Sequence, residues 1–202
     1  MSQTLRFALN RMVAPSLSLE RFVELALSLR IDAVELRNDL PGAGIEHGRA
    51  AAEVRALCAT NGIRVLSINA LYPFDRWNAE RRAQALAAIR EVGGLDVFRL
   101  LHDTFHHHLA GENELFPGLT GLVHISGVED GALPLARIRD GHRVLVGSAD
   151  LLGNARQLRE LRAGGYRGYL SFEPFAGSVH LLPDIAAALG ASIDHLQQAL
   201  RG

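Results

Sequence analysis

The chain has very little cysteine: Cys58 is the only one among 202 residues, so no internal disulfide can form. It also lacks an excess of charge of either sign, because 21 Lys and Arg residues stand against 22 Asp and Glu residues. A nearly neutral chain without clusters of basic residues is not typical of nucleic-acid-binding proteins. We therefore expect no nucleic-acid partner.

Long hydrophobic runs are absent as well. No stretch approaches the roughly 18 apolar residues that a membrane-spanning helix needs. The opening MSQTLRFALNRMVAPS has no apolar core of the kind found in signal peptides. With 48% hydrophobic residues, the chain can still bury a sizeable core. These features predict a single cytoplasmic domain over residues 1–202, without membrane contact.

Two nucleotide-binding motifs are also missing, since no GxGxxG follows the first apolar run and no GxxxxGK[ST] occurs anywhere. The chain instead repeats one pattern, a short apolar run that ends on a polar or charged residue. The six runs are RFALN, DAVELR, RVLSIN, VFRLLHD, GLVHIS and YLSFEP. Segments with helical spacing of apolar residues lie between most of them, most clearly at 18–29, 51–62, 154–165 and 183–200.

Apolar strands that alternate with amphipathic helices indicate βαβ units and a parallel sheet. The predicted fold class is therefore α/β, with a TIM-barrel-like parallel (β/α) sheet. In such barrels the carboxyl ends of the strands form the active face. An open, doubly wound sheet also binds ligands at its strand ends, so either architecture directs attention to the residues at which the apolar runs end.

Six polar residues stand at these predicted strand ends. They are Asn10, Glu35, Asn69, Asp103, His124 and Glu173. A single such residue often does no more than cap its strand, but two carboxylates and an imidazole on three successive strands favour a divalent cation. Mn²⁺, Mg²⁺, Co²⁺ and Zn²⁺ all accept this set of ligands. A charge at the end of an apolar run is costly unless it is paired or bound to metal.

Three further residues are candidates for substrate contact. His106 lies three positions after Asp103 and can titrate near neutrality, whereas we expect His107 and His108 to be loop residues. Arg143, in a long polar connection, either holds a substrate oxygen or is an ordinary surface arginine. Trp77, in LYPFDRWN, either walls a sugar-sized pocket or forms the rim of the core.

Taken together, DAVELRNDL, VFRLLHDTFHH, GLVHISGVED and GYLSFEPF resemble the sugar isomerase and epimerase superfamily with the xylose-isomerase-like TIM barrel. The similarity is greatest to the inosose (2-keto-myo-inositol) isomerase group. It implies that Asp103, His124 and Glu173 bind the metal and that Glu173 is also the catalytic base. It implies that His106 and Arg143 contact the sugar or cyclitol substrate and orient its oxygens, with His106 as a second catalytic residue. We expect Asn10, Glu35, Asn69 and Trp77 to line the same substrate site.

One departure from the family pattern concerns length. Six βα units are recognisable in place of eight, and NAERRAQALAAIREVGG leads directly into the strand LDVFRLLHD. This indicates an internal deletion near residues 88–94. The glutamate with which the fifth strand of the family ends is missing. Either the barrel is naturally shortened, with open edges that favour a homo-oligomer, or the sequence is engineered or incomplete.

These observations predict an enzyme, a divalent-metal-dependent isomerase or epimerase of a keto-sugar or inosose that works through an enediolate. The missing glutamate supports an alternative, a catalytically impaired relative that only binds a sugar or a metal. A hydrolase that cleaves DNA at abasic sites shares the barrel, but the near-neutral charge argues against it.

Overall fold

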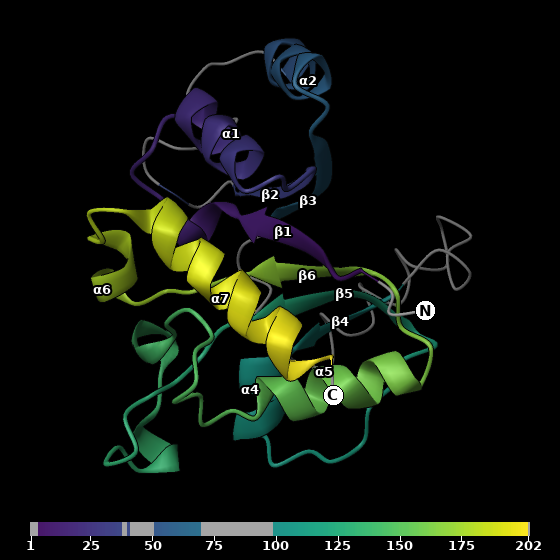
Figure 1. The fold of residues 1–202 in the computed structure, drawn as a ribbon, viewed down its shortest axis with the longest axis vertical. Helices are drawn as coiled ribbons and strands as arrows, with labels where there is room; N and C mark the ends of the chain where they lie inside the picture. Colours follow the sequence, from purple (N-terminus) through teal and green to yellow (C-terminus); the bar gives the residue numbers. More distant parts are fainter. Residues whose placement is uncertain (1–3, 38–39, 41–50, 70–98, 202) are drawn as a thin grey trace, which may run out of the picture.

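The computed structural model describes residues 4–37, 40, 51–69 and 99–201 (Figure 1). Within this part of the chain, six strands form one curled, all-parallel sheet in the order β3-β2-β1-β6-β5-β4. The sheet corresponds to half of a barrel, and it confirms the predicted fold class. Its strands are β1 (Arg6–Asn10), β2 (Ala33–Arg37), β3 (Arg64–Asn69), β4 (Leu100–Asp103), β5 (Thr120–Ile125) and β6 (Tyr169–Phe172).

The central strands are buried along almost their whole length. All residues of β2 and β6 are buried, as are the last four of β1. Continuous apolar runs are what a parallel sheet covered on both faces requires. Phe172 of β6 is fully buried and stacks on Phe7 of β1 with ring centroids 5.7 Å apart. Burying a side chain of this size stabilises the fold by roughly 1.5–3 kcal/mol, which helps to hold β1 and β6 in register.

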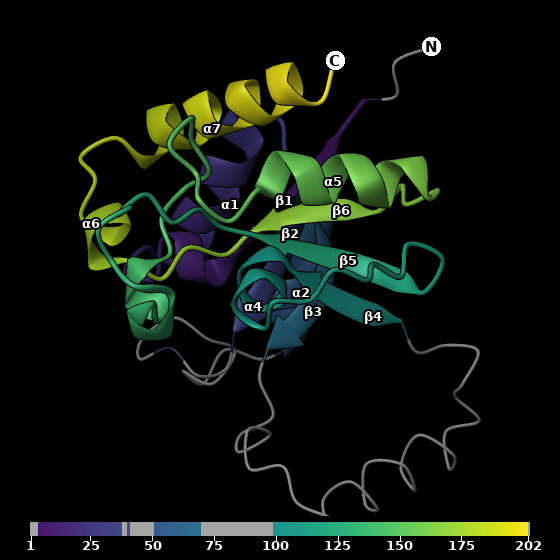
Figure 2. The same ribbon diagram turned by 90° about the horizontal axis from the view of Figure 1, so that it is seen from below.

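Helices cover the outer face of the sheet (Figures 1 and 2). Apolar residues from α1, α5 and α7 pack with residues of the sheet in a single core cluster. Ser18 caps α1 by accepting a hydrogen bond from the Arg21 backbone N–H, as its position predicts. The helices are α1 (Leu19–Ser28), α2 (Ala51–Thr60), α4 (Thr104–Leu109), α5 (Asn154–Ala163), α6 (Gly177–His180) and α7 (Ile185–Ala199).

The two edges of the sheet are β3 and β4, and the chain between them runs through residues 70–98, outside the described residues. The predicted deletion near residues 88–94 and the predicted contact at Trp77 lie in this segment and stay predictions. None of the helices in the described ranges is long and apolar enough to cross a membrane.

The prediction that His107 and His108 lie in a loop is wrong, because both belong to α4. The cause is Asp103, whose Oδ1 atom accepts hydrogen bonds from the backbone N–H groups of Phe105 (2.9 Å) and His106 (3.3 Å). A carboxylate in this position caps a helix. The strand therefore passes directly into α4, which fixes the orientation of Asp103.

Candidate metal centre

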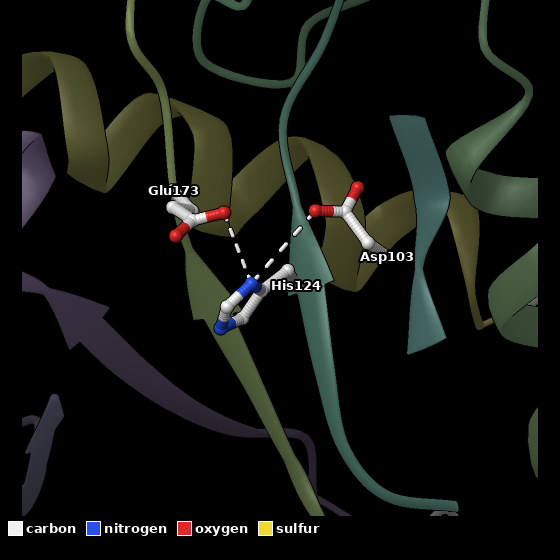
Figure 3. A group of neighbouring side chains, drawn as sticks. All are labelled: Asp103, His124 and Glu173. Atoms are coloured by element: carbon white, nitrogen blue, oxygen red, sulfur yellow. Dashed lines mark ion pairs between the residues drawn. The ribbon is translucent and has the colours of Figure 1, made fainter. Parts of the chain in front are cut away.

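Three neighbouring strands bring Asp103, His124 and Glu173 together at their carboxyl ends (Figure 3). Asp103 ends β4 and lies opposite His124 of β5 in the register. Glu173 directly follows β6, and its backbone N–H donates to the Ile125 carbonyl at 3.0 Å. The parallel register alone thus places three side chains of distant sequence position around one point.

The distances within this group fit a small cation. His124 Nδ1 lies 3.0 Å from Glu173 Oε2 and 3.8 Å from Asp103 Oδ2. Around a tetrahedral ion with bond lengths of about 2.1 Å, neighbouring ligand atoms lie about 3.4 Å apart. Three protein ligands with a further position left for water or substrate is the arrangement of a catalytic rather than a structural site.

Arg143 is the cation that these residues hold in the structure. It is only 1% exposed, and its Nη2 atom donates to Asp103 Oδ2 at 3.1 Å and to Glu173 Oε2 at 3.0 Å. Its Nε atom donates to Ser126 Oγ at 2.9 Å. The guanidinium therefore bridges the two carboxylate oxygens that face His124, the same atoms that would bind a metal.

A second arginine, Arg37 at the end of β2, was not among the predicted site residues. Its Nη1 atom lies 3.0 Å from Glu173 Oε1, and the Asn10 amide donates to the same oxygen at 3.2 Å. The signal in the sequence was the position of Arg37 two residues after Glu35, which places both on the same face of a buried strand. With Arg143 and His124 at Oε2, Glu173 is contacted by four donors.

The electrostatics of the site are set by burial and by the contacts among its charges. Burial alone would lower the pKa of His124, but the neighbouring carboxylates of Asp103, Glu173 and Glu35 raise the pKa well above the ordinary value. Burial alone would raise the pKa of Asp103, yet the neighbouring imidazole of His124 and the charge of Arg143 lower the pKa to about 2. The carboxylates of Glu35, Asp103 and Glu173 are thus in contact with two guanidinium groups and one imidazole, those of Arg37, Arg143 and His124.

The cavity in front of this group has a volume of about 690 Å³. Asp103, His124, Arg143 and Glu173 line it, and so does His106, whose exposed ring is in a position to meet a substrate. The predicted substrate contacts at these residues stay predictions, as does that at Asn69, whose side chain lies outside the described part of the chain.

Asn10 and Glu35 do not line this cavity. Both are buried, and Glu35 is only 1% exposed. Burial alone would raise the pKa of Glu35, but hydrogen bonds from His124, Ser171 and Ser67, together with the charge of His124, lower it to about 2. The predicted contacts of these two residues with substrate stay predictions, and both side chains contact the candidate metal ligands on the side away from the cavity.

Gly127 pairs with the backbone next to Arg143. Its backbone forms two hydrogen bonds of 2.8 Å with Val144, which hold the neighbouring Arg143 over the strand ends. A Cβ atom at position 127 would lie 2.9 Å from the Leu145 carbonyl oxygen. We expect Gly127→Ala to destabilise the protein by about 1–3 kcal/mol in urea unfolding, because the backbone must move. Gly131→Ala is the control, since a Cβ there meets nothing within 4 Å and surface changes usually stay within about 0.5 kcal/mol.

Comparisons with known proteins identify the family and agree with the barrel-like fold. The model of a family described as xylose isomerase-like TIM barrel matches residues 73–199. A crystal structure of a xylose isomerase domain-containing protein from Salmonella typhimurium LT2 is similar over 100% of both chains, with 26% sequence identity and a TM-score of 0.80. The search of curated proteins found no match.

Two more distant structures share the fold. A xylose isomerase domain protein from Alicyclobacillus acidocaldarius has 16% identity and a TM-score of 0.68, over 98% of this chain and 99% of that one. The IOLI protein, solved with a bound zinc atom, has 14% identity and a TM-score of 0.64, over 97% of this chain and 98% of its own.

Proposed function

The chain belongs to the xylose isomerase-like TIM barrel family, and on that premise we propose that it is a divalent-metal-dependent isomerase or epimerase of a keto-sugar or inosose. The observation that carries the proposal is the convergence of Asp103, His124 and Glu173 on one point at the strand ends. The zinc atom in the similar IOLI structure supports a metal in this fold, and the resemblance of the sequence to the inosose isomerase group supports the substrate class.

Asp103, His124 and Glu173 would hold the cation. When bound, the cation would supply Lewis-acid stabilisation of negative charge on the substrate oxygens. Glu173 would take the proton from the carbon between the carbonyl and hydroxyl groups of the substrate. Because two donors already contact each of its oxygens, at least one donor must move away before Glu173 can take the proton. Arg143 borders the cavity, so it can transfer a hydrogen bond from Glu173 to a substrate oxygen.

The alternative is a relative that binds a sugar or a metal without catalysis. The observation in its favour is the small number of carboxylates, since proton transfer on opposite faces of a substrate needs a second base and the family's fifth-strand glutamate is missing. Among the described residues that line the cavity, Asp140 is the only carboxylate besides Asp103 and Glu173, and it pairs with Arg143 at 3.3 Å.

Two measurements together test the proposal. Elemental analysis should find one divalent ion per chain. Incubation of the loaded protein with inosose and other keto-sugars in heavy water should place deuterium at the carbon next to the carbonyl. Metal without deuterium incorporation would favour the binding-only alternative, and absence of metal from protein dialysed against each of the four candidate ions would contradict both the site and the reaction.

Metal affinity is expected to rise by about tenfold per pH unit over the range in which His124 is protonated, because a bound ion requires the Nδ1 lone pair and so releases one proton. The direction follows from the raised pKa of His124: below that pKa the ion must displace a proton, and above it the affinity levels off. Zinc titrations from about pH 6 to pH 8, with the protons released measured in weak buffer, check this. An affinity independent of pH would contradict it.

A further inference from the structure

Glu35 contacts the candidate metal centre through His124, on the side of the ring that faces away from Asp103 and Glu173. It lies on β2, one strand beyond β1 from Glu173, and its side chain does not border the cavity. Its Oε1 atom nevertheless reaches His124, because the sheet curls and brings β2 toward β5. A buried carboxylate with no access to the cavity acts on the site through other residues.

The carboxylate of Glu35 is surrounded by donors. Oε1 accepts from Ser171 Oγ at 2.5 Å and from the Asn10 amide at 3.4 Å, and it lies 2.9 Å from His124 Nε2. Oε2 accepts from Ser67 Oγ at 2.6 Å. These partners lie on four different strands, β1, β3, β5 and β6. They fix the orientation of the carboxylate and the position of the Oε1 atom that faces His124.

Both nitrogens of His124 face carboxylates, which can only accept a hydrogen bond, but the two sides differ in charge. Asp103 and Glu173 on the Nδ1 side also pair with Arg143, whereas the other partners of Glu35 are the uncharged Asn10, Ser67 and Ser171. A neutral His124 therefore keeps its proton on Nε2, where it meets Glu35 at 2.9 Å. Nδ1 faces Asp103 and Glu173, and Figure 3 shows the other ring nitrogen directed away from both. A metal ligand of this kind commonly donates its second N–H to a carboxylate, which fixes the tautomer and the ring.

We propose that Glu35 is a positioning residue, which holds the Nε2–H of His124 so that Nδ1 presents its lone pair to a cation between Asp103 and Glu173. This inference rests on the proposed function only where it concerns the cation. The preference for the Nε2–H tautomer is a property of the chain itself. It assigns to Glu35 a role other than the substrate contact expected from the sequence.

The first experiment uses the wild-type protein without metal. Nitrogen-15 NMR of the histidine rings, at a pH high enough to leave His124 neutral, should show its proton on Nε2. The His124 signals are identified by their loss in His124→Gln. A neutral ring with its proton on Nδ1 would overturn the proposal, and this result does not depend on whether any metal binds.

The second experiment measures zinc affinity in Glu35→Gln. Loss of a partner behind a metal ligand typically weakens binding 10- to 100-fold, and we expect a loss in this range together with a mixture of His124 tautomers. Ser67→Ala is the matched control, because Ser67 donates to Oε2 and does not contact His124. Wild-type affinity and an unchanged tautomer in folded Glu35→Gln would overturn the proposal. A wild-type protein that keeps Nε2–H but binds no zinc would contradict the proposed function alone.

Discussion

Glu173→Gln is expected to slow deuterium incorporation into a keto-sugar or inosose by about 10²- to 10⁴-fold, the usual contribution of a positioned general base. An amide has nearly the shape of a carboxylate but cannot take a proton from carbon. Only the two donors on one side of Glu173 would still find an acceptor, because Asn10 and Arg37 contact Oε1 while Arg143 and His124 contact Oε2. Circular dichroism must therefore show that the variant is folded. The rate is measured by NMR of the substrate in heavy water.

Because Glu173 is also a candidate metal ligand, the metal content of each sample must accompany the rate. Glu160→Gln is the control, since Glu160 is exposed on α5 and pairs with Arg156 at 3.1 Å. Glu160→Gln should exchange deuterium at the wild-type rate. Equal rates in Glu173→Gln and the wild type, both loaded with metal, would remove Glu173 from the role of base.

The strands and most of the candidate site follow from the sequence because both depend on local pattern. Each predicted apolar run became a strand, and Asp103, His124 and Glu173 met because parallel strands end at one edge. An apolar run that ends on a charged residue is visible within a few sequence positions, and it predicts both the strand and the charged side chain at its end.

What the sequence did not reveal depends on contacts between distant segments. The pairing of Arg37 with Glu173 joins β2 to β6 across β1, which requires the curl of the sheet. The alternation of side chains along a strand predicts that Glu35 and Arg37 lie on one face of the sheet. It does not predict which of them reaches the cavity. Arg37 lines the cavity, whereas Glu35 contacts His124 and does not line it. Likewise, nothing in HDTFHHHL distinguishes a capped helix from a loop until Asp103 accepts the N–H groups that follow it.

Arg143→Met is expected to destabilise the metal-free protein by about 3–5 kcal/mol, the typical cost of removing one partner from a buried ion pair. Arg143 is almost fully buried and bridges Asp103 and Glu173, so its loss leaves two buried carboxylates with less compensating charge. Methionine retains much of the side chain's length and its packing against Phe105 and Phe175, which isolates the effect of charge. Urea unfolding in the presence of a chelator measures the change.

The same substitution at Arg156 provides the control, because the Arg156–Glu160 pair is exposed and such pairs contribute at most about 1 kcal/mol.

Zinc then distinguishes a site built for a cation from a purely structural ion pair. At a concentration of 100 times Kd, a ligand stabilises the folded state by about 2.7 kcal/mol. Zinc should stabilise Arg143→Met more than the wild type, since the ion replaces the missing charge and no longer competes with the guanidinium for Asp103 and Glu173. Equal or smaller stabilisation of the variant would show that Arg143 and the metal do not share these oxygens.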